Sequence, residues 1–478
     1  MALMEVKTDC GLVRGARGNN RGFTVFRGIP YGKPPVGALR FAPPQKREPW
    51  EGVLDCTRFE KTCMQTPESF GLYVKEFYPE PKNMGEDCLY LNIWTPADSS
   101  GQDLPVLLWI HGGAYLGGYS YEQEFDGEAM CKRGCILVSI EYRCNAFGFF
   151  GHPELTKRNG RCGSAGMEDQ ILALQWVHEN IAAFGGSPEN ITVFGQSAGA
   201  MSTRTLLTSP RCRGLIRHAI IQSGGGINDW SEYRTMEAQE QLGIRLLEQA
   251  DMTFEEVMTL PEQEVYERLD AAMSAVMGGP CGDLGFHPCI DGYNLVEYAG
   301  QSIKEGRMNC DSILCGGVAG DVDIICQFEE DEPDQGQKKR VAAYSAANAL
   351  GDWMAKSGRR RIYTYYFDHA LPGDGLGSWH SCELWYMFGT MARCWRPWKG
   401  YDYVLSDATV DYWCNFAKSG DPNGPGLPDW SAYTCEKPET MCFSDAGFGM
   451  KNLNLEPYAE EFKKYFQQWG MVRLPGTR

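Results

Sequence analysis

A serine stands at the centre of the segment Gly195-Gln196-Ser197-Ala198-Gly199. The segment follows an apolar run at 191–194, which reads as a buried strand, and precedes a run compatible with a helix. In this setting a G-x-S-x-G sequence forms a sharp strand-to-helix turn that presents the serine hydroxyl above a sheet. In a Gly-rich chain the same letters also occur by chance, as an ordinary turn. The strand–turn–helix context favours Ser197 as a nucleophile.

A second Gly-rich segment, His111-Gly112-Gly113-Ala114, directly follows an apolar run at 106–110. Such a loop can turn two backbone N–H groups toward one point, where they would stabilise an oxyanion. A phosphate-binding loop or a merely tight turn is the alternative. A Walker motif is excluded because no Gly-Lys-Ser/Thr follows.

A serine nucleophile needs a base, and imidazole titrates in the right range. Among the seven histidines, His380 lies in a Gly-led loop at 377–385, late in the chain. The chain order Ser, acid, His is typical of α/β-hydrolases and favours His380. The acid must then precede it, and Asp321 and Asp323 both follow an apolar run at 313–315. Residues two apart on a strand point in similar directions, so the spacing does not show whether Asp321 or Asp323 is the acid. Each of the two is also compatible with a solvated loop.

These segments are separated by alternating strand-like and helix-like patterns. Short apolar runs rich in β-branched and aromatic residues predict strands, and amphipathic stretches predict helices at 169–184 and 236–249. The strand-like runs lie at 106–110, 136–140, 191–194, 219–222 and 362–367. The pattern predicts an α/β fold with a mostly parallel sheet and helices on both faces. The chain has no internal repeat and no long linker, so we expect a single domain over 1–478. We expect its functional site at the carboxyl ends of the strands.

Bulk composition excludes several classes of function. The net charge of −17 over 478 residues argues against nucleic acid as a partner, and no apolar run is long enough to predict a membrane span. The N-terminus lacks the pattern of a secretory signal, and nineteen cysteines, an odd number, suit free thiols in a reducing compartment. We therefore expect a cytoplasmic protein. No cysteine or histidine spacing predicts a metal site, and the oligomeric state stays open.

The order of motifs resembles the type-B carboxylesterase family, which includes bacterial para-nitrobenzyl esterases and cholinesterases. The resemblance runs nearly end to end, through 26–31, 39–41, 86–92, 111–114, 169–177, 184–186, 195–199, the His380 loop and 421–424. It implies an α/β-hydrolase fold and hydrolysis of small-molecule or polymeric esters without a metal or organic cofactor. The implied catalytic residues are Ser197, His380 and Asp321, and the implied oxyanion donors are the N–H groups of Gly113, Ala114 and Ala198. Trp379 and Trp385 flank His380 and are candidates for an apolar substrate pocket.

Three features depart from the family pattern. Asp321 stands where most relatives carry Glu. Cys63 and Cys88 match a cysteine pair that is disulfide-bonded in secreted relatives. Asp321 and His380 are only 59 positions apart, so a segment that usually borders the active-site gorge, here around 324–361, is predicted to be reduced. A more open site should tolerate bulky or aromatic esters.

Two other kinds of function remain open at this stage. An acyltransferase or an amidase could use the same triad as an esterase. Some relatives are non-catalytic adhesion proteins, but those lack the nucleophile, which is present here as Ser197. Hydrolysis of carboxylic esters is the function that the sequence favours.

Overall fold

The structure is a computed structural model of the chain. It describes residues 2–20, 22–66, 73, 76–77, 83–224, 233–277, 285–321, 343, 351–352, 355 and 361–455. Asp323 and nearly all of the segment predicted to be reduced, around 324–361, lie outside the described residues.

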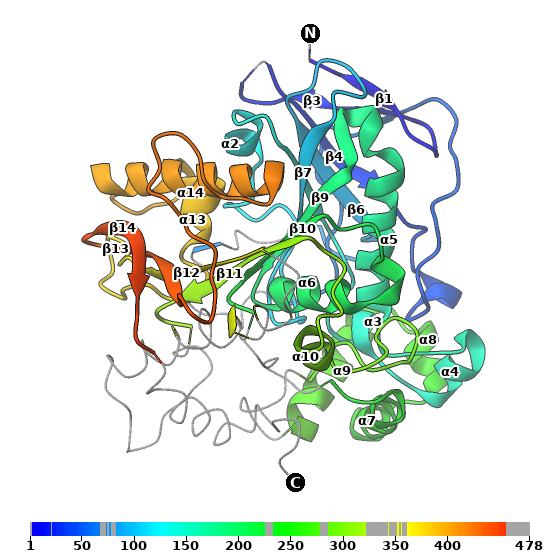
Figure 1. Ribbon diagram of the computed structural model, residues 1–478. Helices are drawn as coiled ribbons and strands as arrows, with labels where there is room; N and C mark the ends of the chain where they lie inside the picture. Colours follow the sequence, from blue (N-terminus) through cyan, green and yellow to red (C-terminus); the bar gives the residue numbers. More distant parts are fainter. Residues whose placement is uncertain are drawn as a thin grey trace.

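One large sheet organises the described part of the chain (Figure 1). Its eleven strands, in chain order, are β3 (Ala16–Arg17), β4 (Thr24–Pro30), β6 (Tyr90–Thr95), β7 (Leu104–Ile110), β8 (Ile136–Ile140), β9 (Gly186–Gln196), β10 (His218–Gln222), β11 (Ser312–Val318), β12 (Arg361–Asp368), β13 (Glu439–Ser444) and β14 (Gly447–Asn452). A separate small sheet contains β1 (Glu5–Lys7), β2 (Leu12–Arg14) and β5 (Val53–Asp55).

The centre of the large sheet is parallel. From one edge to the other the strand order is β14-β13-β12-β11-β10-β9-β7-β8-β6-β4-β3. Each neighbouring pair from β13 to β8 is parallel, and the pairs outside this block are antiparallel. Each of the five strand-like runs falls within one of these parallel strands, so the prediction of a mostly parallel sheet is confirmed.

Helices cover both faces of this sheet. The α-helices in the described residues are α2 (Glu128–Cys131), α3 (Asn145–Phe149), α4 (Pro153–Asn159), α5 (Ala165–Asn180), α6 (Ala198–Thr208), α7 (Met236–Gln249), α8 (Phe254–Thr259), α9 (Glu262–Met277), α10 (Ala299–Lys304), α13 (Leu384–Phe388) and α14 (Gly400–Ser419). Short 3₁₀ helices lie at η1 (Gly37–Leu39), η3 (Ile181–Phe184), η4 (Pro210–Cys212) and η6 (Met391–Arg393). None of the described helices is both long and apolar enough to cross a membrane.

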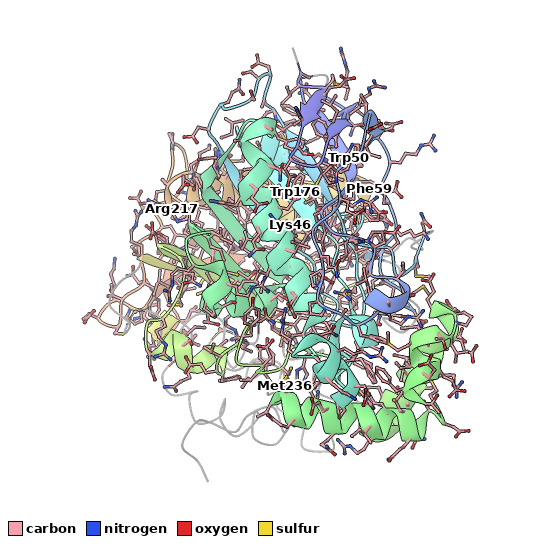
Figure 2. All side chains as sticks on the ribbon, turned by 90° about the vertical axis from the view of Figure 1, so that its right-hand side faces the viewer. Lys46, Trp50, Phe59, Trp176, Arg217 and Met236 are labelled. Carbon is pink, nitrogen blue, oxygen red and sulfur yellow. The ribbon has the colours of Figure 1, made fainter. Side chains whose placement is uncertain are left out.

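The two faces of the sheet make two separate cores because side chains alternate along a strand. On β7, Leu108 packs with the residues that α5 and α6 bury, whereas its neighbour Trp109 packs with those of α14. In Figure 1, α5 and α6 accordingly lie on one side of the sheet, and α14 lies on the other with α2. Figure 2 faces the first side, where Trp176 of α5 is labelled and Met236 marks the start of α7.

Parallel pairing determines where loops can meet. Strands β7, β9 and β11 run in the same direction and end at Ile110, Gln196 and Val318. Their carboxyl ends therefore lie along one edge of the sheet, which is where α/β folds form their sites. The loop of His111, the turn of Ser197 and the loop of Asp321 each follow one of these ends.

Candidate active site

Ser197 occupies a strained turn between β9 and α6. Its backbone has φ 57° and ψ −126°, a conformation that non-glycine residues rarely adopt. Strain of this kind persists only where the surrounding structure holds it, and it is concentrated at functional sites. The residues on either side, Gln196 and Ala198, are buried, whereas Ser197 is partly exposed. The turn therefore presents the serine at the carboxyl edge of the sheet.

The two glycines of this turn are required by close backbone contacts. A Cβ atom on Gly199 would lie 2.0 Å from the carbonyl oxygen of Ile110, at the end of β7. A Cβ atom on Gly195 would lie 2.4 Å from the carbonyl group of Gly199. Both distances are far below van der Waals contact, so only glycine lets α6 start this close to the sheet.

The loop after β7 lies directly against the nucleophile turn. A Cβ atom on Gly112 would lie 3.1 Å from Cβ of Ser197. The next two residues, Gly113 (φ 104°) and Ala114 (φ 56°), are in the left-handed region, so the backbone turns sharply here. Ala198 is the first residue of α6, whose N-terminus carries a partial positive charge. The three amides predicted as oxyanion donors thus come from two backbone segments that meet beside Ser197.

His111 belongs to this loop but is not a second base. Its ring is buried and stacks on Tyr142, with ring centroids 4.4 Å apart. Its Nδ1 lies 2.8 Å from the carbonyl oxygen of Gly112. Burial lowers the pKa of His111 to about 4, so the ring is neutral at neutral pH. Its role in the described structure is to pack beneath the loop.

Asp321 and His380 form a direct pair. Nδ1 of His380 lies 2.6 Å from Oδ1 of Asp321, and both side chains are buried. The other carboxylate oxygen of Asp321 accepts a hydrogen bond from the N–H of Val318 at 3.0 Å. Gly320 N–H donates to the carbonyl of Ser378 at 2.8 Å, which joins the acid loop to the histidine loop. The carboxylate is therefore fixed on both of its oxygens.

The second ring nitrogen of His380 faces the nucleophile turn. Its Nε2 lies 3.1 Å from the side-chain amide nitrogen of Gln196, the residue before Ser197. With Nδ1–H donating to Asp321, Nε2 is the acceptor and the amide is the donor. This is the tautomer that a general base requires. Sequence reasoning did not single out Gln196, because its contact with His380 spans 184 positions.

Ser197 and His380 line one cavity of about 110 Å³. Its other lining residues are Tyr73, Phe77, Gly112, Gly113, Ala114, Glu122, Glu124, Phe125, Gln196, Ser381 and Leu384. Trp379 and Trp385, the candidates for a substrate pocket, are not among them. Both pack against Phe77, with ring centroids 5.5 and 5.6 Å away, and thus lie one layer behind the wall. Phe77 and Phe125 come from segments far from His380 in the chain, and no sequence motif marks them as part of the site.

A buried glutamate borders the Asp321–His380 pair. Glu383 lies three residues after His380, and its carboxyl group is 3.4 Å from the side-chain amide nitrogen of Gln222. Burial, and then the charge of Asp321, raises the pKa of Glu383 to about 7, while His380 acts in the opposite direction. Three ionisable groups of the site are thus electrostatically linked.

Comparison with known proteins identifies the family. The model of the carboxylesterase family matches residues 3–350 and 341–460. The chain belongs to the carboxylesterase family. It is therefore a carboxylic-ester hydrolase with the α/β-hydrolase fold, as the resemblance implied.

Individual members of the carboxylesterase family align along almost the whole chain. The para-nitrobenzyl esterase of Bacillus subtilis is 30% identical over 500 residues, covering 97% of this chain and 99% of that relative. An acetylcholinesterase of Bungarus fasciatus is 29% identical, covering 96% and 84%. Among solved structures, a thermophilic PNB esterase matches with a TM-score of 0.81 at 29% identity, covering 97% and 100%. A carboxylesterase of Geobacillus stearothermophilus matches with a TM-score of 0.78 at 32% identity, covering 96% and 99%.

Proposed function

We propose that this carboxylesterase acts through an acyl-enzyme on Ser197, with His380 as general base and acid and Asp321 as the orienting acid. The observation that carries the proposal is the 2.6 Å pair of Asp321 and His380, whose ring lines the same cavity as the strained Ser197 turn. A nucleophile, a base and an orienting acid in this chain order are the parts that ester hydrolysis needs.

The reaction runs in two halves. His380 Nε2 takes the proton of the Ser197 hydroxyl as it attacks the ester carbonyl, and the imidazolium is stabilised by Asp321. The backbone N–H groups of Gly113, Ala114 and Ala198 stabilise the oxyanion. His380 then gives its proton to the departing alcohol. Water enters, loses a proton to His380 and attacks the acyl-enzyme. The bond between the acyl carbon and Ser197 Oγ then breaks, His380 returns its proton to that oxygen, and the acid is released.

Replacing the nucleophile tests this mechanism. We expect Ser197→Ala to lower kcat for 4-nitrophenyl acetate by about 10³-fold or more, because the triad acts as a unit. A fluorophosphonate probe should label the wild-type protein and not the variant, while the melting temperature shows that both are folded. Labelling of Ser197→Ala at the wild-type rate would assign the nucleophile elsewhere.

The choice of acid has its own test. Asp321→Asn should lower kcat by up to about 10⁴-fold, because an amide favours the wrong imidazole tautomer. Asp323→Asn is the comparison variant, and we expect it to have a mild effect. A larger loss for Asp323→Asn than for Asp321→Asn would move the role of orienting acid to Asp323.

The walls of the cavity suit an apolar or aromatic ester. Tyr73, Phe77, Phe125 and Leu384 supply rings and an aliphatic side chain around Ser197, and apolar walls discriminate only weakly between groups of different size. The sequence predicts a reduced segment around 324–361, and tolerance of bulky acyl groups is therefore part of the proposed function. A sharp preference for acetate over aromatic acid esters in kcat/KM would contradict it.

Buried thiols support a cytoplasmic location as part of this proposal. Cys63, Cys88 and Cys144 are all free and buried, and the N–H of Cys144 lies 3.3 Å from the sulfur of Cys63. Contact with Cys63 and burial raise the pKa of Cys88, which favours its protonated, less reactive form. Mass analysis after denaturing alkylation should count nineteen thiols. A bond between Cys63 and Cys88 in fresh protein would indicate an exported enzyme.

A further inference from the structure

The side chain of Gln65 is paired with the backbone of a residue in the loop after β7. Its Oε1 accepts a hydrogen bond from the N–H of Gly118 at 2.7 Å, and its Nε2 donates to the carbonyl oxygen of the same residue at 3.0 Å. Gln65 is 3% exposed, and it is not among the residues that line the cavity of Ser197. Gly118 is buried too. Loss of the Gln65 amide would therefore leave the N–H of Gly118 without its acceptor, in a place where water does not replace it.

Gly118 belongs to a compact loop that also contains two of the proposed oxyanion donors. Across this loop, the carbonyl of Gly113 accepts a hydrogen bond from the N–H of Gly117 at 3.1 Å. A Cβ atom on Gly113 would lie 2.2 Å from the carbonyl oxygen of Gly117. A Cβ atom on Gly118 would lie 2.7 Å from the carbonyl oxygen of Gly112. The two sides of the loop are thus in direct backbone contact, and a shift of Gly118 would be passed on to 112–114.

A second buried amide holds the middle of the same loop. The backbone N–H of Asn145 donates to the carbonyl of Tyr115 at 2.6 Å, and its side chain donates to the carbonyl of Leu116 at 3.2 Å. The same side-chain nitrogen donates to the carbonyl of Met64, next to Gln65, at 2.6 Å. Because these bonds do not involve Gln65, the loop should persist when the Gln65 amide is removed. Only the position of its far side would then be less well fixed.

We propose that Gln65 is a positioning residue for the oxyanion donors of this esterase. The proposal rests on the proposed function, in which the N–H groups of Gly113 and Ala114 stabilise the oxyanion. Such donors are effective when they are fixed in advance toward the point where the charge develops. Gln65 holds Gly118, which packs on the residue directly before these donors. The carbonyl oxygen of a bound ester carries far less charge than the oxyanion, so misplaced donors weaken the transition state more than the substrate complex.

Gln65→Met tests this role, because it removes both hydrogen bonds and keeps the length of the side chain. We expect kcat and kcat/KM for 4-nitrophenyl acetate to fall together by about tenfold to 10²-fold, the effect of a small misplacement on a transition state. KM should stay within about twofold of the wild-type value. Rates are expressed per active site, titrated with a fluorophosphonate, so that unfolded protein does not contribute.

A pair of ketones separates the oxyanion donors from the rest of the cavity. Ser197 Oγ adds to the carbonyl carbon of decyl trifluoromethyl ketone, its proton passes to His380, and the carbonyl oxygen becomes an oxyanion. Decyl methyl ketone has a similar shape and resists this addition. In Gln65→Met, the Ki of the trifluoromethyl ketone should rise by about the factor by which kcat/KM falls, as expected of a transition-state analogue. The Ki of the methyl ketone should change by less than about twofold.

Gln239→Met is the matched control for the loss of a buried amide. Gln239 is 1% exposed, and its amide donates to the carbonyl of Phe149 at 2.6 Å and accepts from Arg234 at 3.1 Å. We expect this variant to lower Tm while its kcat per active site and both Ki values stay near those of the wild type. If Gln65→Met does not fold, Gln65→Glu takes its place, since it keeps an acceptor for the N–H of Gly118. It should show the same effects at smaller size.

Several outcomes would overturn the proposal. One is a wild-type kcat per active site in the Gln65 variant, and another is an equal loss of kcat in Gln239→Met. An equal rise in Ki for the two ketones would also do so, because it would show that Gln65 shapes the cavity and not the oxyanion donors. Failure of the proposed function is seen separately, as fluorophosphonate labelling of Ser197→Ala.

Discussion

His380 is held from two sides by groups of different charge. Asp321 accepts from Nδ1 at 2.6 Å, and the amide of Gln196 faces Nε2 at 3.1 Å. In the proposed mechanism the carboxylate stabilises the imidazolium that forms during the reaction, whereas the neutral amide does not. A donor on Nε2 competes with the hydroxyl of Ser197 for the same lone pair. The hydrogen bond from Gln196 must therefore break or weaken before Nε2 of His380 can accept the proton of Ser197.

A charge at position 196 should move the pH dependence of catalysis. Gln196→Glu places a carboxylate beside Nε2, which stabilises the protonated ring that cannot act as a base. We expect the acid limb of the kcat/KM profile to shift upward by about one pH unit. Gln196→Met keeps the size without charge or donor, and its limb should move much less than that of Gln196→Glu. An unmoved limb in Gln196→Glu would show that the two side chains separate during turnover.

The proposed catalytic residues could be predicted from the sequence where they lie in local motifs. Ser197 lies in a five-residue pattern whose strand and helix neighbours are visible, and the order of the chain singled out His380. The choice between Asp321 and Asp323 could not be made from spacing. Gln196 carried no signal as a partner of His380, because that contact joins residues 184 positions apart and exists only in the folded chain.

At the level of elements, the parallel centre of the sheet was predictable and its margins were not. Strands β7 and β8 are buried on both faces and read as continuous apolar runs. The outer strands β4 and β14 lack such runs. β4 contains Arg27 and Gly28 and has an irregular register between Phe26 and Ile29, and β14 alternates glycines with larger residues. Among the strands that lead to the candidate site, β7 thus had the clearest sequence signal.

The close approach of α6 to β7 makes a prediction about the nucleophile turn. Gly199→Ala would place a methyl group 2.0 Å from the carbonyl oxygen of Ile110, so α6 must shift away from the sheet. We expect a loss of about 2 kcal/mol or more in the free energy of unfolding, together with a large loss of kcat.

Gly400→Ala is the matched control. Position 400 has no other atoms within 4 Å of the added carbon and begins α14, so its stability should be unchanged or slightly higher. Equal stability of the two variants would contradict the packing argument.

At the scale of the whole molecule, the interior holds acids whose ionisation is disfavoured by burial. Glu141 is buried beneath the loop of Ser120, accepts hydrogen bonds from its N–H and hydroxyl, and has a pKa that burial raises to about 7. Burial also raises the pKa of Glu383, beside Asp321 and His380, to about 7. The net charge is already −17, so each further ionisation adds both a desolvation cost and repulsion. The free energy of unfolding of this chain therefore depends on pH in part through its buried carboxyl groups.

This coupling predicts how stability changes with pH. In the unfolded chain a glutamate has a pKa of about 4.3, so a folded value near 7 means that the folded state binds the proton more tightly. The resulting stabilisation is fully present below about pH 4 and is lost as pH rises through about 7. We expect Tm to fall between about pH 5 and about pH 8, with Glu383 contributing on the order of 1–3 kcal/mol.

Glu383→Gln has no carboxyl group to titrate, so its Tm should depend less on pH, and the difference from the wild type should grow toward about pH 8. The surface variant Glu237→Gln should follow the wild-type curve. If the curves of Glu383→Gln and the wild type stayed parallel, Glu383 would have to be ionised in the folded protein throughout this range, stabilised there by a partner that offsets its burial.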